Sequence, residues 1–432
     1  MNRSLLLFQA LNRPLPLMLA VNRPLLLILF TVFLDVVGLG IVIPVAPFYA
    51  TSFGATPLQV GLLFTVFAAA QFLATPVLGA LSDRFGRRPV LLLSLAGETA
   101  GYLIMGLAPN LAVLYLARLV SGGTAGNIGA ATAYLADISP PERRTQTFGL
   151  FGAAFGVGFL FGPAMGGALS TLDIRAPALA AAGLVFLNFI FAAFWLPESL
   201  PLGRRSSEPV RARANPLRLL LTLVDRPVLR APLLATFLVN FAFSGMQTNL
   251  AVYLSQRFSF GPGEVAGLFV AMAVVGILSQ AFLVGKLSTR VSDVWLLVLG
   301  FGLTVVAYLG IGLAPAPEAL WPVVAVQSLG SAFWRPALAS LVSKLVSSRE
   351  QGLVNGGSQS ITSLASVLGP IGAGLAYEHL GIAAPYWLGA AATALAGLVM
   401  LHAGARFSTS SPAARVTSTR VVQARAAERR LG

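Results

Sequence analysis

Apolar runs of about twenty residues recur along nearly the whole chain and are separated by short polar segments. The chain has 432 residues, of which 56% are hydrophobic and only 10% charged, whereas a soluble domain carries about a quarter charged residues. A helix needs roughly 20 apolar residues to cross a bilayer. The sequence therefore predicts an all-α integral membrane protein with twelve transmembrane helices. They are expected near residues 25–49, 57–81, 89–109, 111–136, 146–171, 177–196, 230–255, 263–287, 292–314, 319–346, 352–376 and 384–404.

Basic residues fall almost entirely on one side of this predicted map. The chain has 29 Lys and Arg against 15 Asp and Glu, a net charge of +14. Only Arg175 and Arg257 lie on the other side, and only Arg118 and Arg335 lie inside runs. The positive-inside rule then predicts that both termini are cytoplasmic. We expect the chain to lie in the plasma (inner) membrane. This segregation explains the net charge without a nucleic-acid partner.

The longest polar interruption divides the chain into two similar halves. We expect residues 199–229 to be a cytoplasmic linker between six-helix halves at 25–198 and 230–404. Gly149, Gly162 and Pro163 recur as Gly356, Gly369 and Pro370, each 207 positions later. We interpret residues 1–24 as an N-terminal cytoplasmic extension, with either Met1 or Met18 as the start, and residues 405–432 as a basic cytoplasmic tail.

Residues for catalysis or cofactor binding are scarce. The chain has no Cys and only two His, His379 and His402. We find no metal-ligand spacing, no nucleophile elbow and no Walker loop, so we expect no metal, no cofactor and no enzymatic activity.

Two carboxylates lie deep inside predicted spans. Asp35 and Glu98 each follow the start of their run by ten or so residues, which places them about 15 Å into the bilayer. Charged groups at that depth are costly and are functional candidates by default. Alternating surroundings would let such a carboxylate bind and release a proton. The alternatives are a static ion pair at Asp35 and, for Glu98, a local hydrogen bond or a side chain that reaches toward the headgroups.

The segment from Gly79 to Pro89, G-A-L-S-D-R-F-G-R-R-P, places four charges between two apolar runs. It resembles the signature loop between spans 2 and 3 of the major facilitator superfamily. The resemblance implies the major facilitator fold, with two pseudo-symmetric six-helix halves that rock around a central site.

The same resemblance assigns roles in a conformational latch. Asp83 would face the N-terminus of a span from the other half, and Arg87 would pair with Asp137. Gly79 would allow close helix packing and Gly86 a tight turn. Arg84 and Arg88 complete the cluster. The alternative is that the arginines only obey the positive-inside rule.

Two further motifs point to a drug:proton antiporter. Gly149, Gly158, Gly162, Pro163, Gly166 and Gly167 fill a span-5 pattern associated with that branch, although ordinary small-residue packing would also use them. Arg118 begins an R-x-x-x-G-x-x-x-G pattern in span 4, and the resemblance ties it to proton coupling with Asp35 in span 1.

Within the superfamily the chain is most similar to tetracycline-efflux transporters. This implies a proton-coupled antiporter that exports amphipathic, tetracycline-like or cationic compounds and works as a monomer. Candidate substrate contacts are the polar residues inside spans, each of which could equally join helices: Gln71, Asn240, Ser244, Gln247, Gln280, Gln327 and Gln359. The resemblance has gaps: Gly101 replaces an aspartate, Gly276 lies near the place of a histidine, and span 9 lacks a carboxylate. An exporter or facilitator of a metabolite such as a sugar remains the alternative.

Overall fold

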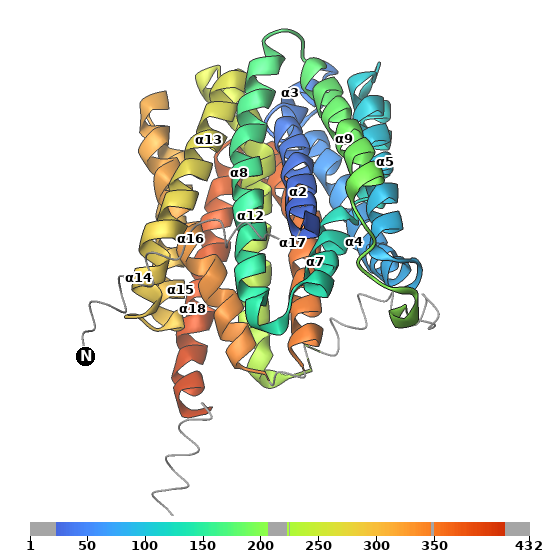
Figure 1. Ribbon diagram of the computed structural model, residues 1–432. Coiled ribbons are helices and arrows are strands. Elements are labelled where there is room, and N and C mark those ends of the chain that lie inside the picture. Colours follow the sequence, from blue (N-terminus) through green and yellow to red (C-terminus); the bar gives the residue numbers. More distant parts are fainter. Residues whose placement is uncertain (1–22, 206–222, 224, 347–349, 411–432) are drawn as a thin grey trace, which may run out of the picture.

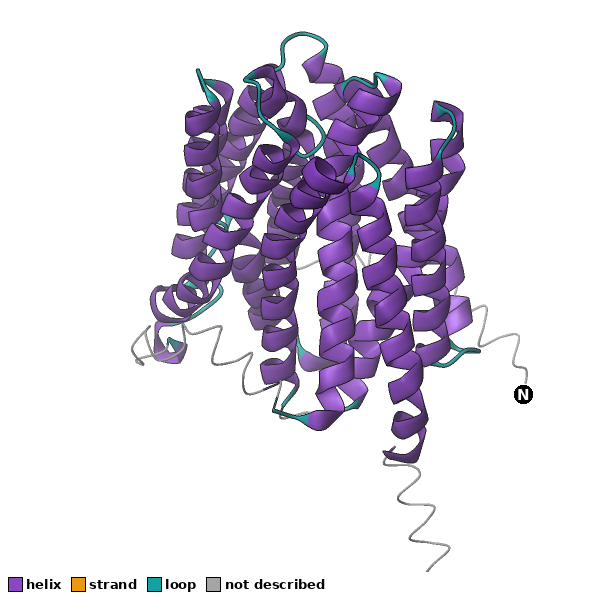
Figure 2. Ribbon diagram, turned by 180° about the vertical axis from the view of Figure 1, so that it is seen from behind, coloured by secondary structure: helices purple, strands orange, loops and turns teal. Residues whose placement is uncertain are grey.

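Long helices that run alongside one another make up the computed structural model (Figure 1). The structure describes residues 23–205, 223, 225–346 and 350–410. Within them it contains no strand, so the all-α prediction is confirmed, and loops join the helices at the two ends of the bundle (Figure 2). The predicted extension and tail lie almost wholly outside the described residues, as does most of the linker.

The helices of the first half are α2 (Arg23–Val42), α3 (Ala46–Ser52), α4 (Pro57–Phe85), α5 (Arg87–Gly106), α6 (Leu111–Gly123), α7 (Asn127–Ile138), α8 (Arg144–Ser170) and α9 (Ala176–Trp195). Those of the second half are α12 (Pro227–Phe258), α13 (Pro262–Leu278), the π-helical turn η4 (Ser279–Val284), α14 (Gly285–Ser288), α15 (Asp293–Leu313), α16 (Leu320–Lys344), α17 (Gln351–Leu380) and α18 (Ala384–Ser410). Short 3-10 turns cover Pro141–Arg143, Leu202–Arg204 and Pro317–Ala319.

Ten helices in the described part of the chain are long and apolar enough to cross a membrane. The other two predicted spans are helical, but neither is a single, uniformly apolar helix. The predicted run 111–136 is divided into α6 and α7, and α16 carries Gln327 and Arg335. The count of twelve therefore stays a prediction.

Glycine explains the division between α6 and α7. Gly122, Gly123 and Gly126 lower the helix propensity of this stretch. A Cβ on Gly126 would lie 2.7 Å from Leu78 of α4 and 3.1 Å from Ser94 of α5. The chain thus leaves the helical path where it passes closest to two neighbouring helices, and Asn127 begins α7.

The two halves are packed alike around glycine contacts. A Cβ on Gly162 of α8 would lie 2.6 Å from the Cα of Gly40 of α2. The equivalent α17 meets α12 at Gly369 and Gly245, where a Cβ on Gly245 would lie 3.0 Å from the carbonyl oxygen of Gly369. Gly162 and Gly369 are the positions that the sequence repeat relates, so the repeat corresponds to the same helix crossing in each half.

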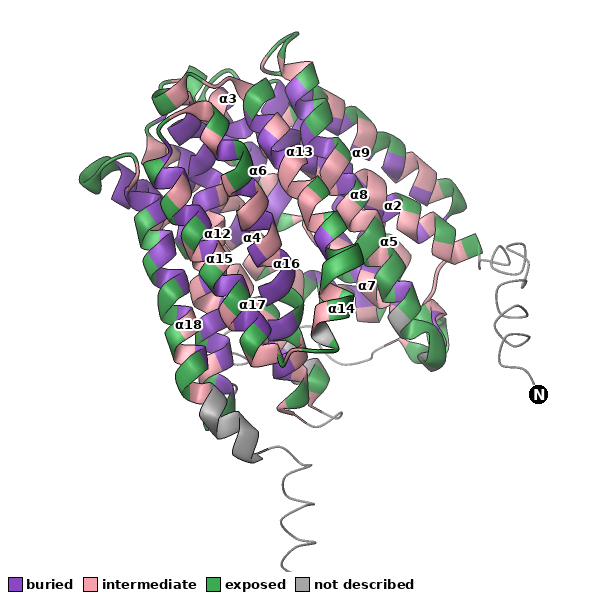
Figure 3. Ribbon diagram, turned by 90° about the vertical axis from the view of Figure 1, so that its left-hand side faces the viewer, coloured by how far each residue is buried: buried purple, intermediate pink, exposed green. Residues whose placement is uncertain are grey.

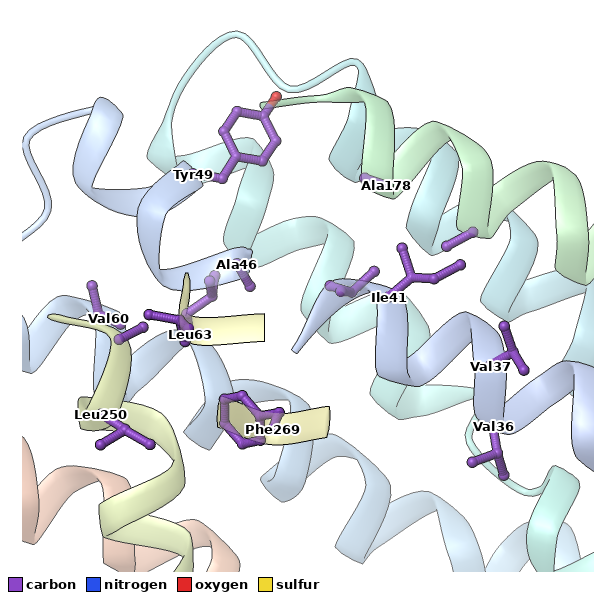
Figure 4. Close-up of a cluster of buried hydrophobic side chains, with 14 of the residues drawn as sticks. Val36, Val37, Ile41, Ala46, Tyr49, Val60, Leu63, Ala178, Leu250 and Phe269 are labelled. Atoms are coloured by element: carbon purple, nitrogen blue, oxygen red, sulfur yellow. The ribbon is translucent and has the colours of Figure 1, made fainter. Parts of the chain in front are cut away.

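Described contacts between the halves gather at one end of the bundle. We name it the far end, and we name the other end, which carries Arg84 to Arg88, the basic end. Near the far end, the Leu58 N–H donates to Glu378 Oε1 at 3.0 Å, and Thr65 Oγ1 donates to the Val367 carbonyl at 3.0 Å. A hydrophobic cluster joins Leu63 of α4 to Leu250 of α12 and to α13 (Figure 4).

Toward the basic end, the first turns of α8 are open. Every residue described from Gln146 to Gly152 is exposed or half-buried except Thr147 (Figure 3). A Cβ on Gly149 would meet nothing within 4 Å, whereas one on Gly167, near the far end, would lie 2.6 Å from Ala266 of α13. The halves are therefore joined at the far end in this conformation.

Candidate functional site

A pair of buried carboxylates joins α2 to α5. Asp35 is 5% exposed and Glu98 6% exposed. The Nδ2 atom of Asn127 donates one hydrogen bond to Asp35 Oδ1 at 2.5 Å and another to Glu98 Oε2 at 2.9 Å. A single amide thus holds both acids close together, and Tyr102 donates to the remaining Glu98 oxygen at 2.9 Å.

This arrangement favours a shared proton. Two carboxylates side by side in a water-poor site resist being ionised together, because like charges repel strongly where the dielectric is low. All the donors just described belong to neutral side chains. The pair is therefore suited to hold one proton between two acids and to release it when its surroundings change.

Asn127 is the residue of this site that sequence reasoning missed. An asparagine in a membrane span usually indicates nothing more than a contact between helices. The available signal was its place directly after the glycines that end α6, since a break in a span exposes polar groups at that depth. Glu98 was considered able to bond locally or to reach toward the headgroups. It bonds Tyr102 locally, and it stays buried.

Arg118, which the resemblance ties to proton coupling with Asp35, forms no salt bridge with Asp35 among the described residues. It is 5% exposed and lies over the rings of Phe64 and Phe67, with its Cζ 5.7 and 6.0 Å from their centroids. Its Nε and Nη2 atoms have no hydrogen-bond partner among the described residues, and no salt bridge within those residues joins it to Asp35. Asp35 meets Asn127 and Glu98 instead, so the proposed Asp35–Arg118 contact is absent from this conformation.

The surroundings of Gly101 explain why α5 carries its acid at Glu98 and not at position 101, where the tetracycline exporters have an aspartate. A Cβ on Gly101 would lie 2.0 Å from Ser121 Oγ and 3.1 Å from the Ala117 carbonyl of α6. A side chain there would push α5 away from α6. Glu98, one helical turn earlier, has room to reach Asn127.

The charged loop at the basic end forms several of the predicted contacts. Arg87 Nε lies 3.0 Å from Asp137 Oδ2, so this expected pair is present, and Arg87 Nη1 lies 2.5 Å from Asp83 Oδ1. Gly86 has φ 113°, a region that favours glycine, as the expected tight turn requires. The position of Asp83 against a helix of the second half stays a prediction.

Glu198 ties this loop to the end of α9. Its two carboxylate oxygens accept the Arg87 N–H at 2.9 Å and the Arg88 N–H at 3.2 Å. An acid at the start of α5 also faces the positive end of the helix dipole. The Arg88 guanidinium donates to the Ala193 carbonyl of α9.

The close helix packing expected at Gly79 is absent from this conformation, so its role in the latch stays a prediction. Gly79 was expected to permit close packing between helices, but it is exposed, and a Cβ there would meet no described atom within 4 Å. The α4 backbone approaches no other helix at this point of the present conformation, so packing does not require a glycine.

We expect Arg87→Gln to lower the free energy of unfolding by about 1–3 kcal/mol, because two partly buried carboxylates lose a cation. Arg84→Gln removes the same charge from the same loop, but Arg84 is exposed, and a change within about 0.5 kcal/mol is expected. Thermal unfolding of both variants in detergent measures the difference. Equal shifts would show that the charge cluster, and not the Arg87 contacts, matters.

The predicted substrate contacts differ in their surroundings, and their role stays a prediction. Asn240 donates to the Thr236 carbonyl at 2.7 Å and Ser244 to the Ser366 carbonyl at 3.4 Å, so both bond backbone here. The others have the following surroundings: Gln71 and Gln247 are half-buried, Gln280 and Gln359 are exposed, and Gln327 is buried with neither side-chain polar atom bonded in the described structure.

The glycines of the span-5 motif have different surroundings along α8. A Cβ on Gly158 would lie 3.0 Å from Val36, and one on Gly166 would lie 2.2 Å from the Ile41 carbonyl oxygen. With Gly162, these positions form a close contact with α2, the helix that carries Asp35. α8 stays helical through Pro163, and Gly149 lies in its open portion.

Comparison with known proteins places these features in a family context. The sequence model of the Major Facilitator Superfamily matches residues 28–326 and 266–430. Tetracycline resistance protein class C of Escherichia coli is 35% identical over 350 residues, which cover 80% of this chain and 87% of that protein. Quinolone resistance protein NorA of Staphylococcus aureus is 27% identical over 376 residues, 86% of this chain and 94% of that protein.

Solved structures agree with the fold. The human organic anion transporter MFSD10 (TETRAN) superimposes with a TM-score of 0.67 at 27% identity, covering 88% of this chain and 99% of that one. Nucleoside transporter NupG gives a TM-score of 0.74 at 13% identity, covering 88% and 100% respectively, a likeness of fold alone.

Proposed function

Because the chain belongs to the Major Facilitator Superfamily, we propose that it exports amphipathic drugs in exchange for protons. The observation that carries the proposal is the buried Asp35–Asn127–Glu98 cluster. Two carboxylates that share one amide donor can carry a proton between them. Asp35 lies on α2, which packs against α8, and the glycine motif of α8 fits the antiporter branch. The names of the relatives, tetracycline and quinolone resistance proteins, indicate the compounds to test first.

We assign the basic end of the bundle to the cytoplasm by the positive-inside rule, and both termini with it. We also propose that the protein lies in the plasma (inner) membrane and acts as a monomer. On this assignment the halves are joined on the outer side, which makes the present conformation inward-facing. The drug would enter from the cytoplasm, and a proton would enter from outside after the halves rock.

The charged loop from Gly79 to Pro89 would act as a latch in the outward-facing state. Arg87, Asp83 and Asp137 already form one ionic cluster within the first half. When the basic end closes, this cluster would meet the second half and hold the outward-facing state. The tie from Glu198 to the start of α5 would keep the loop in place during that movement.

A vesicle experiment tests the proposal. In inverted vesicles with an acidic lumen, addition of tetracycline or a quinolone is expected to release protons faster than in vesicles without the protein. The reason is that drug entering the lumen exchanges for protons leaving it. A pH-sensitive dye reports the release, and an ionophore that removes the gradient should abolish it.

No drug-dependent release from folded protein, across tetracyclines, quinolones and cationic dyes, would contradict drug:proton antiport. Drug uptake that persists without a proton gradient would separate export from proton coupling.

A further inference from the structure

Arg335 of α16 has no role in the carboxylate site, and its surroundings are unusual. Its guanidinium lies over the ring of Phe243 of α12, with Cζ 4.6 Å from the centroid, and 5.1 Å from that of Trp334. The side chain is exposed. Its guanidinium nevertheless contacts a ring of the neighbouring helix α12, so it lies on the surface that α16 shares with α12.

An arginine inside a span can instead extend its side chain to the headgroups, which here would be those at the basic end. Arg335 precedes Lys344, the last residue of α16, by nine residues, which is about 13 Å along the helix. The guanidinium does not point toward that end but contacts Phe243, halfway along α12. The cation is therefore held against α12.

Hydroxyl groups that could donate to an anion lie on the same face of α16 as this cation. No salt bridge within the described residues involves Arg335. Ser331 and Ser328 lie four and seven residues before it on the same face of α16. Their buried hydroxyls have no hydrogen-bond partner in the described structure, and buried polar groups without partners call for a water or a ligand.

We propose that Arg335 forms an anion-binding subsite for the exported compound, with Phe243 as a stacking surface for the ring next to the acidic group. This inference rests on the proposed function and narrows it: the preferred substrates carry a carboxylate or similar anion beside an aromatic body. Arginine binds carboxylates through two parallel hydrogen bonds, and removal from bulk water strengthens such a contact. A cation without the acidic group would gain nothing from this subsite.

A matched pair of dyes tests the subsite. Rhodamine 110 carries a free carboxylic acid, and rhodamine 123 is its methyl ester. Fluorescence anisotropy with the purified full-length protein gives the dissociation constant of each. We expect Arg335→Gln to weaken rhodamine 110 by about 10- to 100-fold, the effect of one charged hydrogen-bonded contact, and to change rhodamine 123 by less than about threefold. Arg335→Lys should weaken rhodamine 110 binding by less than Arg335→Gln does.

Arg257→Gln is the matched control. Arg257 also lies over aromatic rings, those of Tyr253 and Phe258, but near the far end, so it should leave both affinities unchanged. Equal loss of both dyes in Arg335→Gln, or no loss of rhodamine 110, would overturn the subsite and leave drug export intact. Binding of neither dye to the wild type would overturn the subsite and count against the proposed function as well. If Arg335→Gln does not fold, the same ratio measured on Arg335→Lys decides.

Discussion

Asp35→Asn and Glu98→Gln are each expected to abolish drug-driven proton release in inverted vesicles, a loss of at least about 100-fold. Both substitutions preserve shape and hydrogen-bonding reach while removing the group that can ionise. Because one amide holds both acids, we expect each to be needed, since a lone acid would lose the neighbour whose charge drives the proton off. Proton release measured with a pH-sensitive dye is the readout.

Asp173→Asn provides the matched control, since Asp173 is an exposed carboxylate in a loop at the far end and accepts only a local hydrogen bond from Arg175. It should release protons at the wild-type rate. Drug binding should survive in Asp35→Asn and Glu98→Gln, which separates loss of coupling from loss of folding. Full release in one of the two variants would place the proton on the other acid alone.

Gly162→Val is expected to lower the free energy of unfolding by about 3 kcal/mol or more, enough to leave little folded protein. The added Cβ would lie 2.6 Å from the Cα of Gly40, which is backbone and cannot rotate away. α2 and α8 would have to separate, and α2 carries Asp35. The measurements are the yield of monodisperse protein in detergent and its thermal unfolding.

Gly149→Val controls for helix propensity, because it makes the same change in the same helix at a position with nothing within 4 Å. Its cost should stay below about 1 kcal/mol. Stability is the readout to compare, since Gly149 would approach the second half when the basic end closes, and transport could suffer there for another reason. Equal losses at the two positions would show that the α2–α8 crossing does not depend on close approach.

Much of the fold could be predicted from the length of the apolar runs and the distribution of charged residues between them. Apolar runs long enough to cross a bilayer, and basic residues that fall almost entirely on one side of the predicted map, leave few alternatives. The pairing of Arg87 with Asp137 was also predictable, since the resemblance to the superfamily loop assigns Asp137 as the partner. The break before Asn127 was not, because hydropathy averaged over a window does not detect a few glycines inside an apolar run.

The carboxylate site was predicted only in part. Asp35 and Glu98 stand out as charges in apolar runs, but nothing in the sequence says that they meet. Their meeting depends on how α2, α5 and α7 cross, and on an amide that looks ordinary in one dimension. The expected partner of Asp35, Arg118, was inferred by resemblance, and the structure places it against Phe64 and Phe67 instead.

The interruption between α6 and α7 has a consequence for hydration. In a continuous helix every peptide group within the membrane is bonded, but the first turn of α7 begins with N–H groups that the helix itself cannot satisfy. These groups sit at Asn127, beside the two acids. We therefore expect water at this depth of the bundle, and the amides from Asn127 to Gly129 should exchange with deuterium far faster than those in the middle of α2. Such a map would show whether water can reach Asp35 and Glu98.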